Sequence, residues 1–280
     1  MVRAEDIGVG PSDELSLRVS AAALARVVFF HPDDGIRMLA LEHKATVARP
    51  PADPQVTLRA QPFGGAVRIR NVDGFSSFLG GFAFDSKRSQ SESDFRIFVG
   101  PSSLDAVHEY CLRWMGGGAE TELETDPSRE LWEEFRDALR LELDAEMYAI
   151  DPVGIVLEDR PTPTRNVRAP GVPTARIYWV YEVEIRDVAV CRSLLTNSIT
   201  HSAQDLRRAA LSAHERGEPG WANAALVLRL DDVRETFEGL PPEARDKPVP
   251  FQGTVLAGNV VAVFEDVAVP KYERIDVNRV

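Results

Sequence analysis

Three glutamates of this chain, Glu130, Glu133 and Glu134, combine a reactive side chain with a spacing that brings them together. On an α-helix, residues at positions i, i+3 and i+4 share one face, so the three carboxylates would stand side by side. Each like-charged pair at such a spacing repels by roughly 0.2–0.5 kcal/mol, and a hard divalent cation such as Mg²⁺, which prefers oxygen ligands, would remove that repulsion. Arg129 can pair with Glu133 and orient it. The pattern therefore predicts a face that binds a metal ion.

The helix that must carry these glutamates has an apolar opposite side. Asp126-Pro127 is typical of an N-cap followed by proline at the first helical position, and the pattern predicts a helix from there to Met147. Its apolar residues are Leu131, Trp132, Phe135, Ala138, Leu139 and Leu143. Residues 120–146 hold eleven acidic residues and three arginines, a local charge of −8 out of the formal −12. The alternative to a metal face is an amphipathic helix whose acidic side is only solvated.

The segments around this helix mix strand and helix patterns without a βαβ order, which favours an α+β fold. Asp34-Gly35 separates apolar runs at 26–31 and 36–43 and predicts a β-hairpin. Strict alternation over residues 177–186 predicts a half-buried strand. Residues 73–94 look irregular, and residues 159–175 look like a loop. The remaining expectations are strands at 56–60, 66–72, 95–99 and 223–230, helices at 102–114, 203–216, 232–239 and 242–245, and an apolar segment at 259–267.

The order of residues around the three glutamates resembles a known motif. Arg129-Glu130-Leu131-x-Glu133-Glu134 matches the core of the Nudix box, which reads Arg-Glu-aliphatic-x-Glu-Glu. The hairpin, the turn Pro62-Phe63-Gly64-Gly65, the strand at 177–185 and the closing segment Trp221…Leu230-Asp231-Asp232-Val233 follow in the order of that fold. The chain thus resembles a Nudix-superfamily protein from about Ala25 to Val267, although only the helix motif is specific.

The resemblance implies an α/β/α sandwich with a mixed sheet. Residues 1–24 would be an N-terminal arm, residues 25–270 the Nudix-like domain with a long insertion at about 73–125 before the box helix, and residues 271–280 a tail. Glu130, Glu133 and Glu134 would bind Mg²⁺ or Mn²⁺, with Glu130 as ligand or catalytic base and Arg129 as organiser. The implied activity is a Nudix pyrophosphohydrolase that cleaves the pyrophosphate of a nucleoside diphosphate linked to another group, such as a nucleotide sugar or dinucleotide cofactor.

The chain departs from the family's pattern at two points. Arg136 stands where the box has a glycine, two residues after the Glu-Glu pair. Gly118 as the box glycine would put Glu124 at the right offset but three residues too close to Arg129, whereas Gly64-Gly65 requires an insertion of about sixty residues, which we favour because folds tolerate long surface insertions. These departures leave open an inactive Nudix-fold protein that binds nucleotides or regulates a partner. An unrelated α+β domain with a surface acidic helix is the third alternative.

Substrate contacts are expected from glycines and arginines outside the helix. Paired glycines at Gly64 and Gly65 allow close approach to the backbone, and Arg68 follows on a strand next to them. Arg165 and Arg168 lie in the proline-rich loop and could clamp phosphates, because a guanidinium matches phosphate geometry. Glu182 or Glu184 could complete the metal site, but we favour the alternative that they form cross-strand ion pairs.

Composition limits the partners. The 280 residues include 44 acidic and 32 basic residues, and a formal charge of −12 argues against duplex nucleic acid or an anionic membrane surface as partner. Two cysteines and no visible targeting segment suggest a reducing compartment, with the cytoplasm as the default. The expected ligand is a nucleotide-type small molecule, and a homodimer is a possible assembly.

Overall fold

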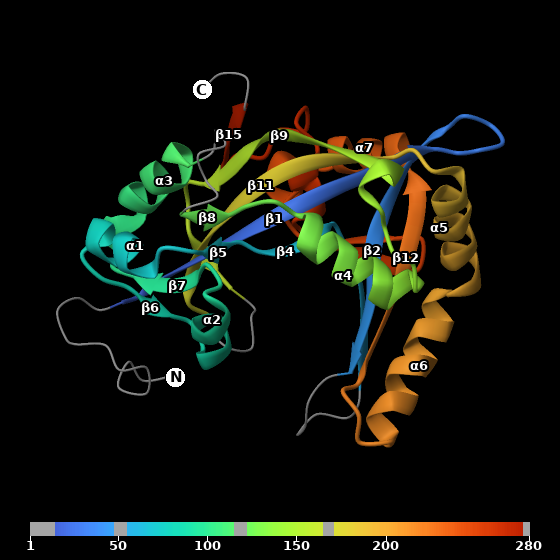
Figure 1. The fold of residues 1–280 in the computed structure, drawn as a ribbon, viewed down its shortest axis with the longest axis horizontal. Helices are drawn as coiled ribbons and strands as arrows, with labels where there is room; N and C mark the ends of the chain where they lie inside the picture. Colours follow the sequence, from blue (N-terminus) through green and yellow to red (C-terminus); the bar gives the residue numbers. More distant parts are fainter. Residues whose placement is uncertain (1–14, 48–54, 115–121, 165–170, 277–280) are drawn as a thin grey trace.

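A single curled sheet of mixed strand direction organises the fold, and α-helices pack against both of its sides (Figure 1). The computed structural model describes residues 15–47, 55–114, 122–164 and 171–276. Within these residues thirteen strands join the sheet, whose main path runs β13-β14-β3-β2-β1-β11-β9-β15. The described residues thus form a mixed α+β fold, as the sequence predicts.

Strand β1 (Leu17–Phe30) is the centre of this sheet. It pairs in parallel with β11 (Pro173–Ile185) and antiparallel with β2 (Arg37–Val47), β4 (Phe63–Ala66) and β7 (Arg96–Val99). The predicted hairpin at Asp34-Gly35 is confirmed, with Gly35 at a positive φ of 70°. The strand begins inside the segment expected to be an arm, because small residues such as Ala21 and Ala23 are buried there without giving a strong sequence pattern.

Strand β2 leaves β1 after a short pairing and becomes the middle of a three-stranded ribbon. Its partners there are β3 (Val56–Gln61) and β12 (Trp221–Arg229), both antiparallel. Helix α6 (Ala203–Glu215) covers one face of this ribbon through Leu206 and Ala210. Helix α5 (Val188–Thr200) packs along β12, and sequence reasoning missed it because its apolar residues do not follow one helical face.

The described residues between β4 and β8 build a lobe of short elements on the N-terminal half of β1. They are β5 (Arg68–Ile69), α1 (Val72–Leu79), β6 (Ala83–Phe84), α2 (Lys87–Glu92), β7, α3 (Leu104–Arg113) and β8 (Leu123–Glu124). The expectation of irregular structure at 73–94 is therefore wrong. Asn71 and Ser86 cap α1 and α2, and the rings of Phe75, Phe95 and Tyr110 pack at 4.8–5.0 Å between centroids.

Helix α4 (Ser128–Leu139) follows this lobe and carries the three glutamates. It starts later and ends earlier than the sequence predicts: Asp126 accepts hydrogen bonds from Ser128, and Arg140 ends the helix in a left-handed conformation at φ 54°. The chain then enters β9 (Tyr148–Glu158) and, after β10 (Thr162–Pro163), β11. Part of the segment expected to be a loop at 159–175 is thus strand, because β11 begins at Pro173.

The C-terminal part closes the face of the sheet opposite α4. It consists of α7 (Leu230–Glu238), β13 (Val249–Phe251), β14 (Thr254–Leu256), the buried 3₁₀ turn Val260–Val263 and β15 (Tyr272–Asp276). The segment expected to be a tail includes β15, which pairs with β9 because its backbone completes the edge of the sheet.

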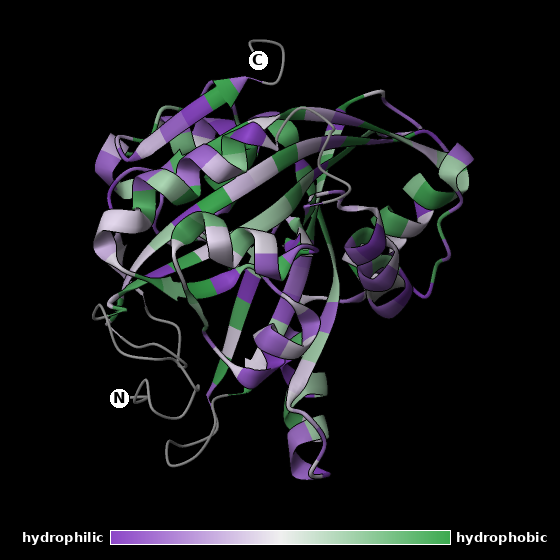
Figure 2. Cartoon of the chain, turned by 60° about the vertical axis from the view of Figure 1, so that its left-hand side comes forward, coloured by the Kyte–Doolittle hydropathy of each residue, from purple (hydrophilic) through white to green (hydrophobic). Residues whose placement is uncertain are grey.

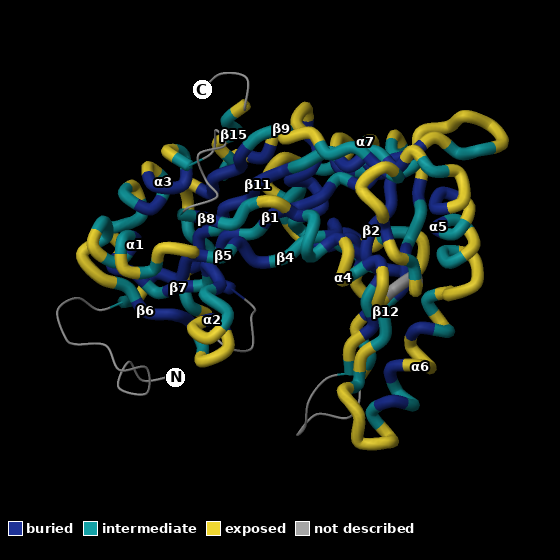
Figure 3. The backbone as a smooth tube through the Cα atoms, viewed as in Figure 1, coloured by how far each residue is buried: buried dark blue, intermediate teal, exposed yellow. Residues whose placement is uncertain are grey.

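Burial and hydropathy follow this layered arrangement. Hydrophobic segments run along the central strands (Figure 2), and these strands are also the most continuously buried part of the chain (Figure 3). The β1–β2 turn and the far end of α6 are exposed (Figure 3). In the described part of the chain no helix is both long and apolar enough to cross a membrane.

Candidate functional site

Helix α4 lies directly against Gly64 and Gly65, which are strand residues of β4 and not the turn that the sequence predicts, although the two segments are about 65 residues apart in sequence. The backbone N–H of Gly64 donates a hydrogen bond of 2.8 Å to Oε2 of Glu134. A Cβ at residue 65 would overlap the side chain of Glu130, and a Cβ at residue 64 would overlap the carbonyl of Ala23 on β1. Both glycines are therefore required by the close packing of β4 between β1 and α4.

Apolar residues on the other side of α4 fix it in this place. Leu131 and Phe135 are fully buried, and the ring of Phe135 packs on Phe63 at 5.0 Å between centroids. Burial of side chains of this size contributes roughly 1.5–3 kcal/mol each. Because Phe63 directly precedes Gly64, the same contact that holds the helix also sets the two glycines beside the glutamates.

Arg129 links three carboxylates at the start of α4. It pairs with Glu124 at 2.9 Å and Glu130 at 2.5 Å, and more loosely with Glu133 at 3.5 Å. Burial opposes the charge of Arg129, but its bonds to Glu124 and Glu130 outweigh burial and raise its pKa. Burial likewise opposes ionisation of Glu124, yet Arg129 holds the pKa of that carboxyl below its usual value. The sequence predicted a pair with Glu133, whereas the stronger partners are Glu124 and Glu130.

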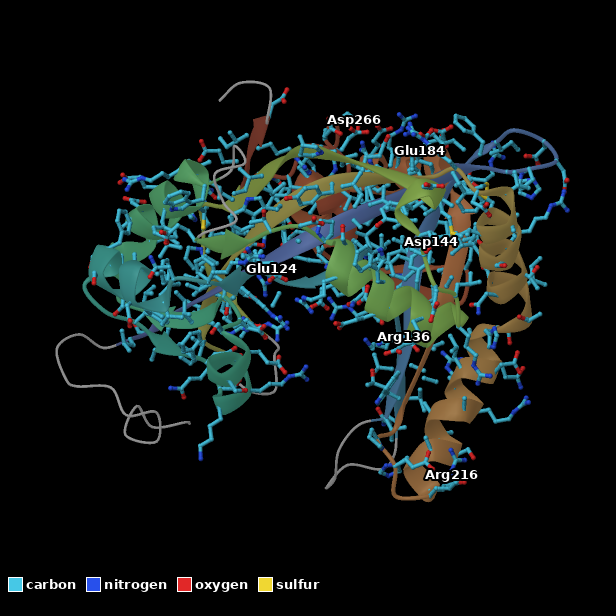
Figure 4. All side chains as sticks on the ribbon, viewed as in Figure 1. Glu124, Arg136, Asp144, Glu184, Arg216 and Asp266 are labelled. Atoms are coloured by element: carbon cyan, nitrogen blue, oxygen red, sulfur yellow. The ribbon has the colours of Figure 1, made fainter. Side chains whose placement is uncertain are left out.

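The two ends of α4 differ in their surroundings. Glu124 lies near its first turn, whereas Arg136, at the position where the motif that this segment resembles has a glycine, lies near its last (Figure 4). Glu133 is half exposed at 49%, on the rim of the glutamate face. Arg136 is also exposed and contacts Asp137 at 3.7 Å. The helix thus continues through Arg136 and ends at Leu139.

Glu134 is the carboxylate in the least favourable environment. Burial raises the pKa of its carboxyl well above the usual value, and repulsion from Glu42 on β2 and from Glu130 adds to this effect. The Gly64 N–H and the charge of Lys44 act in the opposite direction but do not outweigh it. An ionised Glu134 therefore lacks sufficient positive charge around it.

Glu42 is a member of the site that sequence reasoning missed. Its side chain is 1% exposed and accepts hydrogen bonds from Lys44 and Gln61, both at 2.8 Å, and from Asn223 at 3.3 Å. A glutamate and a lysine two residues apart within the apolar run of β2 were the available signal. A sequence alone does not show that this strand passes beside α4, so the signal could not be connected with Glu134.

The predicted arginines have different outcomes. Arg68 lies on β5 close to Glu124, and its Nε is buried without a hydrogen-bond partner among the described residues. Arg165 and Arg168 lie outside the described residues. Glu182 binds Arg26 and Arg37, each at 2.8 Å, and Glu184 binds Arg186, so neither strand glutamate joins the carboxylates of α4.

Two surface pockets lie away from these glutamates. One of about 220 Å³ is lined by Arg26, Arg37 and Arg234 among others, and one of about 350 Å³ is lined by Asp144, Met147 and their neighbours. The arginines of the first pocket are already paired with acidic side chains. Neither of these two pockets includes a residue of α4.

The side chains of this face are of the kind that a hard cation prefers as ligands, but they are not arranged as a metal site. Within the described ranges, no group of three or more His, Cys, Asp or Glu side chains is arranged to hold a metal ion. Glu130 and Glu134 nevertheless supply carboxylate oxygens, the ligands that Mg²⁺ and Mn²⁺ prefer, and they repel each other and Glu42. A divalent cation would relieve that repulsion, so the two glutamates fit such an ion.

Comparison of the chain with protein-family models, with curated proteins and with solved structures gave no match.

Proposed function

We propose that this protein is a metal-dependent hydrolase of the Nudix type. Its substrate would be a nucleoside diphosphate linked to another moiety, of the nucleotide sugar or dinucleotide cofactor class, cleaved at the pyrophosphate. The observation that supports this proposal best is the packing of α4 on Gly64 and Gly65, with Glu134 bonded to Gly64 and Glu130 filling the space that Gly65 leaves. The two parts of the motif, far apart in sequence, meet in one place.

Each residue of the face has a role in this proposal. Glu130 and Glu134 would hold Mg²⁺ or Mn²⁺, with Glu133 at the rim. Such an ion neutralises phosphate charge and supplies an activated water when bound. Arg129 orients Glu130 through their ion pair, and the Gly64 N–H orients Glu134. Gly64 and Gly65 let β4 pack closely between β1 and α4 and so hold the glutamates in place, and the guanidinium of Arg68 on β5 would bind a phosphate oxygen.

A specific observation supports a second candidate, a nucleotide-binding protein without turnover. Each of the three helix glutamates already has a partner within the chain, because Arg129 holds Glu130 and Glu133 and the Gly64 N–H holds Glu134. Arg136 in place of the box glycine also extends the helix past the turn of the motif. A protein of this kind would keep α4 as a scaffold and bind the nucleotide alone.

Turnover distinguishes the two candidates. Release of nucleoside monophosphate is measured over a panel of nucleotide sugars and dinucleotides with Mg²⁺, with Mn²⁺ and with chelator. We expect cation-dependent release by the wild type and a loss of at least a hundredfold in Glu130→Gln and Glu134→Gln. Asp137→Asn, an exposed carboxylate on the same helix, is the matched control and should leave the rate unchanged. Equal rates in all variants would contradict the site, and absent turnover with nucleotide binding would favour the second candidate.

A further inference from the structure

The β12–β2–β3 ribbon has one face that no described helix covers below α4. Its residues form rows across the three strands, because directly paired residues of antiparallel strands point to the same side. One row is Ala225, Glu42 and Gln61, the next is Asn223, Lys44 and Arg59, and the last is Trp221, Thr46 and Thr57. The intervening residues, including Ala45 and Leu58, are buried under α6 on the opposite face. The residues of the second and third rows are polar or aromatic and at least partly exposed, whereas Ala225 and Glu42 of the first row are buried.

The middle row places two cations opposite each other. Lys44 on β2 is the direct partner of Arg59 on β3, and like charges at such positions destabilise a sheet. Lys44 is neutralised in part by Glu42 at 2.8 Å. Arg59 has no ion pair or hydrogen bond to any described residue. An arginine that lies beside a lysine and has no carboxylate partner can bind an anion. Such a position stands out in a chain whose net charge is −12.

The surroundings of Arg59 reinforce this interpretation. The side chain is exposed to solvent, yet the protein around it lowers the pKa of the guanidinium by desolvation, and the charge of Arg176 on β11 lowers it further. A second guanidinium close by adds to the positive potential at this end of the ribbon. Arg176 itself pairs with Glu158, which also binds Lys271, and Lys271 has a second partner in Asp246, so Arg59 is the cation of this group without a carboxylate partner among the described residues.

The rows also have a regular order along the strands. Successive rows are two residues apart, or roughly 6.5–7 Å at the usual rise of a strand. The row next to α4 contains Glu42, the neighbour of Glu134. Lys44 and Arg59 follow in the second row, and Trp221, 43% exposed, ends the third. Carboxylates, cations and an aromatic ring thus follow one another over about 14 Å.

We propose that this face binds a nucleotide, with Arg59 and Lys44 contacting its phosphates and Trp221 stacking on its base. This assignment rests on the proposed hydrolase in one respect, because it orients the substrate with its phosphates toward Glu130 and Glu134. Guanidinium groups bind phosphate oxygens bidentately, and base stacking on an aromatic ring tolerates different bases. The row order sets the direction: the phosphates lie nearest the glutamates and the base lies farthest from them.

Binding of two probes separates the parts of this proposal. Titration calorimetry in the presence of chelator measures the Kd of ADP and of inorganic pyrophosphate for the wild type, Arg59→Gln and Trp221→Ala. We expect Arg59→Gln to weaken both probes by roughly tenfold to a hundredfold, the loss typical of a charged hydrogen bond. Trp221→Ala should weaken ADP by about tenfold and leave pyrophosphate within twofold. Arg208→Gln, an exposed arginine on α6 away from this face, is the matched charge control and should change neither Kd.

The outcomes distinguish this face from the hydrolase. Unchanged Kd values in Arg59→Gln, or no binding of either probe to the wild type, would overturn the nucleotide face even if hydrolysis is found. The expected pattern of Kd values together with no hydrolysis would establish the face and remove the hydrolase. Both altered residues are exposed, so folding should be preserved, and thermal unfolding of each variant checks this. Arg59→Lys, which retains the charge, should recover part of the affinity for both probes.

Discussion

Two buried clusters of charged residues in this protein are built in opposite ways. In the lobe, Arg18 is bonded to one oxygen of Asp85 at 2.7 and 2.9 Å, and Ser89 donates to the other oxygen at 2.6 Å. Beside α4, Glu42 is buried and Glu134 is partly exposed, and burial together with repulsion from Glu42 raises the pKa of the Glu134 carboxyl. In the first cluster the carboxylate is bonded to a cation and a hydroxyl, although burial still lowers the pKa of Arg18, whereas in the second the carboxylates repel one another. Perturbed charges of the second kind gather at functional sites, and this difference supports the glutamate face as the site.

The largest expected effect is a loss of folding stability, and it tests the Arg18–Asp85 cluster of the lobe. Asp85→Ala leaves Arg18 buried without its counterion, and loss of one partner of a buried pair typically costs about 3–5 kcal/mol. The free energy of unfolding, measured by urea denaturation, should fall by that amount. Glu92→Ala breaks the exposed pair with Arg88 and is the matched control, with an expected change below about 0.5 kcal/mol. A fall of less than 1 kcal/mol for Asp85→Ala would show that the lobe does not depend on this pair.

A smaller effect concerns His43, which lies next to Glu42 on β2 but points to the opposite face of the strand. Burial lowers the pKa of its imidazole to about 4, the charge of Arg207 contributes, and the ring contacts Thr254 at 3.0 Å. The folded chain thus keeps this ring neutral where the unfolded chain, at a pKa near 6.5, begins to bind a proton. Stability is therefore full above pH 6.5 and decreases as the pH falls toward 4, by about 2 kcal/mol at pH 5.

The measurement is the urea denaturation of wild type and His43→Gln at pH 7 and pH 5. The variant cannot be protonated at this position, so its loss of stability between the two values should be about 2 kcal/mol smaller than that of the wild type. Equal losses would mean that the neutral ring is not a source of acid sensitivity.

The sequence predicts the individual strands and helices of this fold better than the contacts between them. Asp34-Gly35 defines a hairpin, and the alternation from Ile177 predicts a strand, because both depend on neighbours in sequence. Helix α5 and the end of α4 at Leu139 were missed or misplaced, because α5 has apolar residues on more than one side and Arg140 ends α4 without a glycine. Such features depend on packing.

The candidate site likewise contains residues that the sequence predicts and contacts that it does not. Arg129 and the three glutamates follow from the motif, and the Gly64-Gly65 turn was the favoured partner of the helix. Glu42 could not be found, because its proximity to Glu134 depends on how β2 diverges from β1. The partnership of Arg129 with Glu124 was also hidden, since the spacing of five residues crosses the start of α4. Both pairings depend on how strands and helices pack against one another, which the sequence alone does not show.

The most direct test of the central claim is the stability of Glu134→Gln with and without Mg²⁺. The amide removes the repelled charge and keeps an acceptor for the Gly64 N–H. In chelator we therefore expect the variant to be more stable than the wild type by about 1 kcal/mol, in the range typical of relieving an unfavourable site. Mg²⁺ should stabilise the wild type and leave the variant unchanged. A variant that is less stable in chelator, together with an equal response of both proteins to Mg²⁺, would contradict the account.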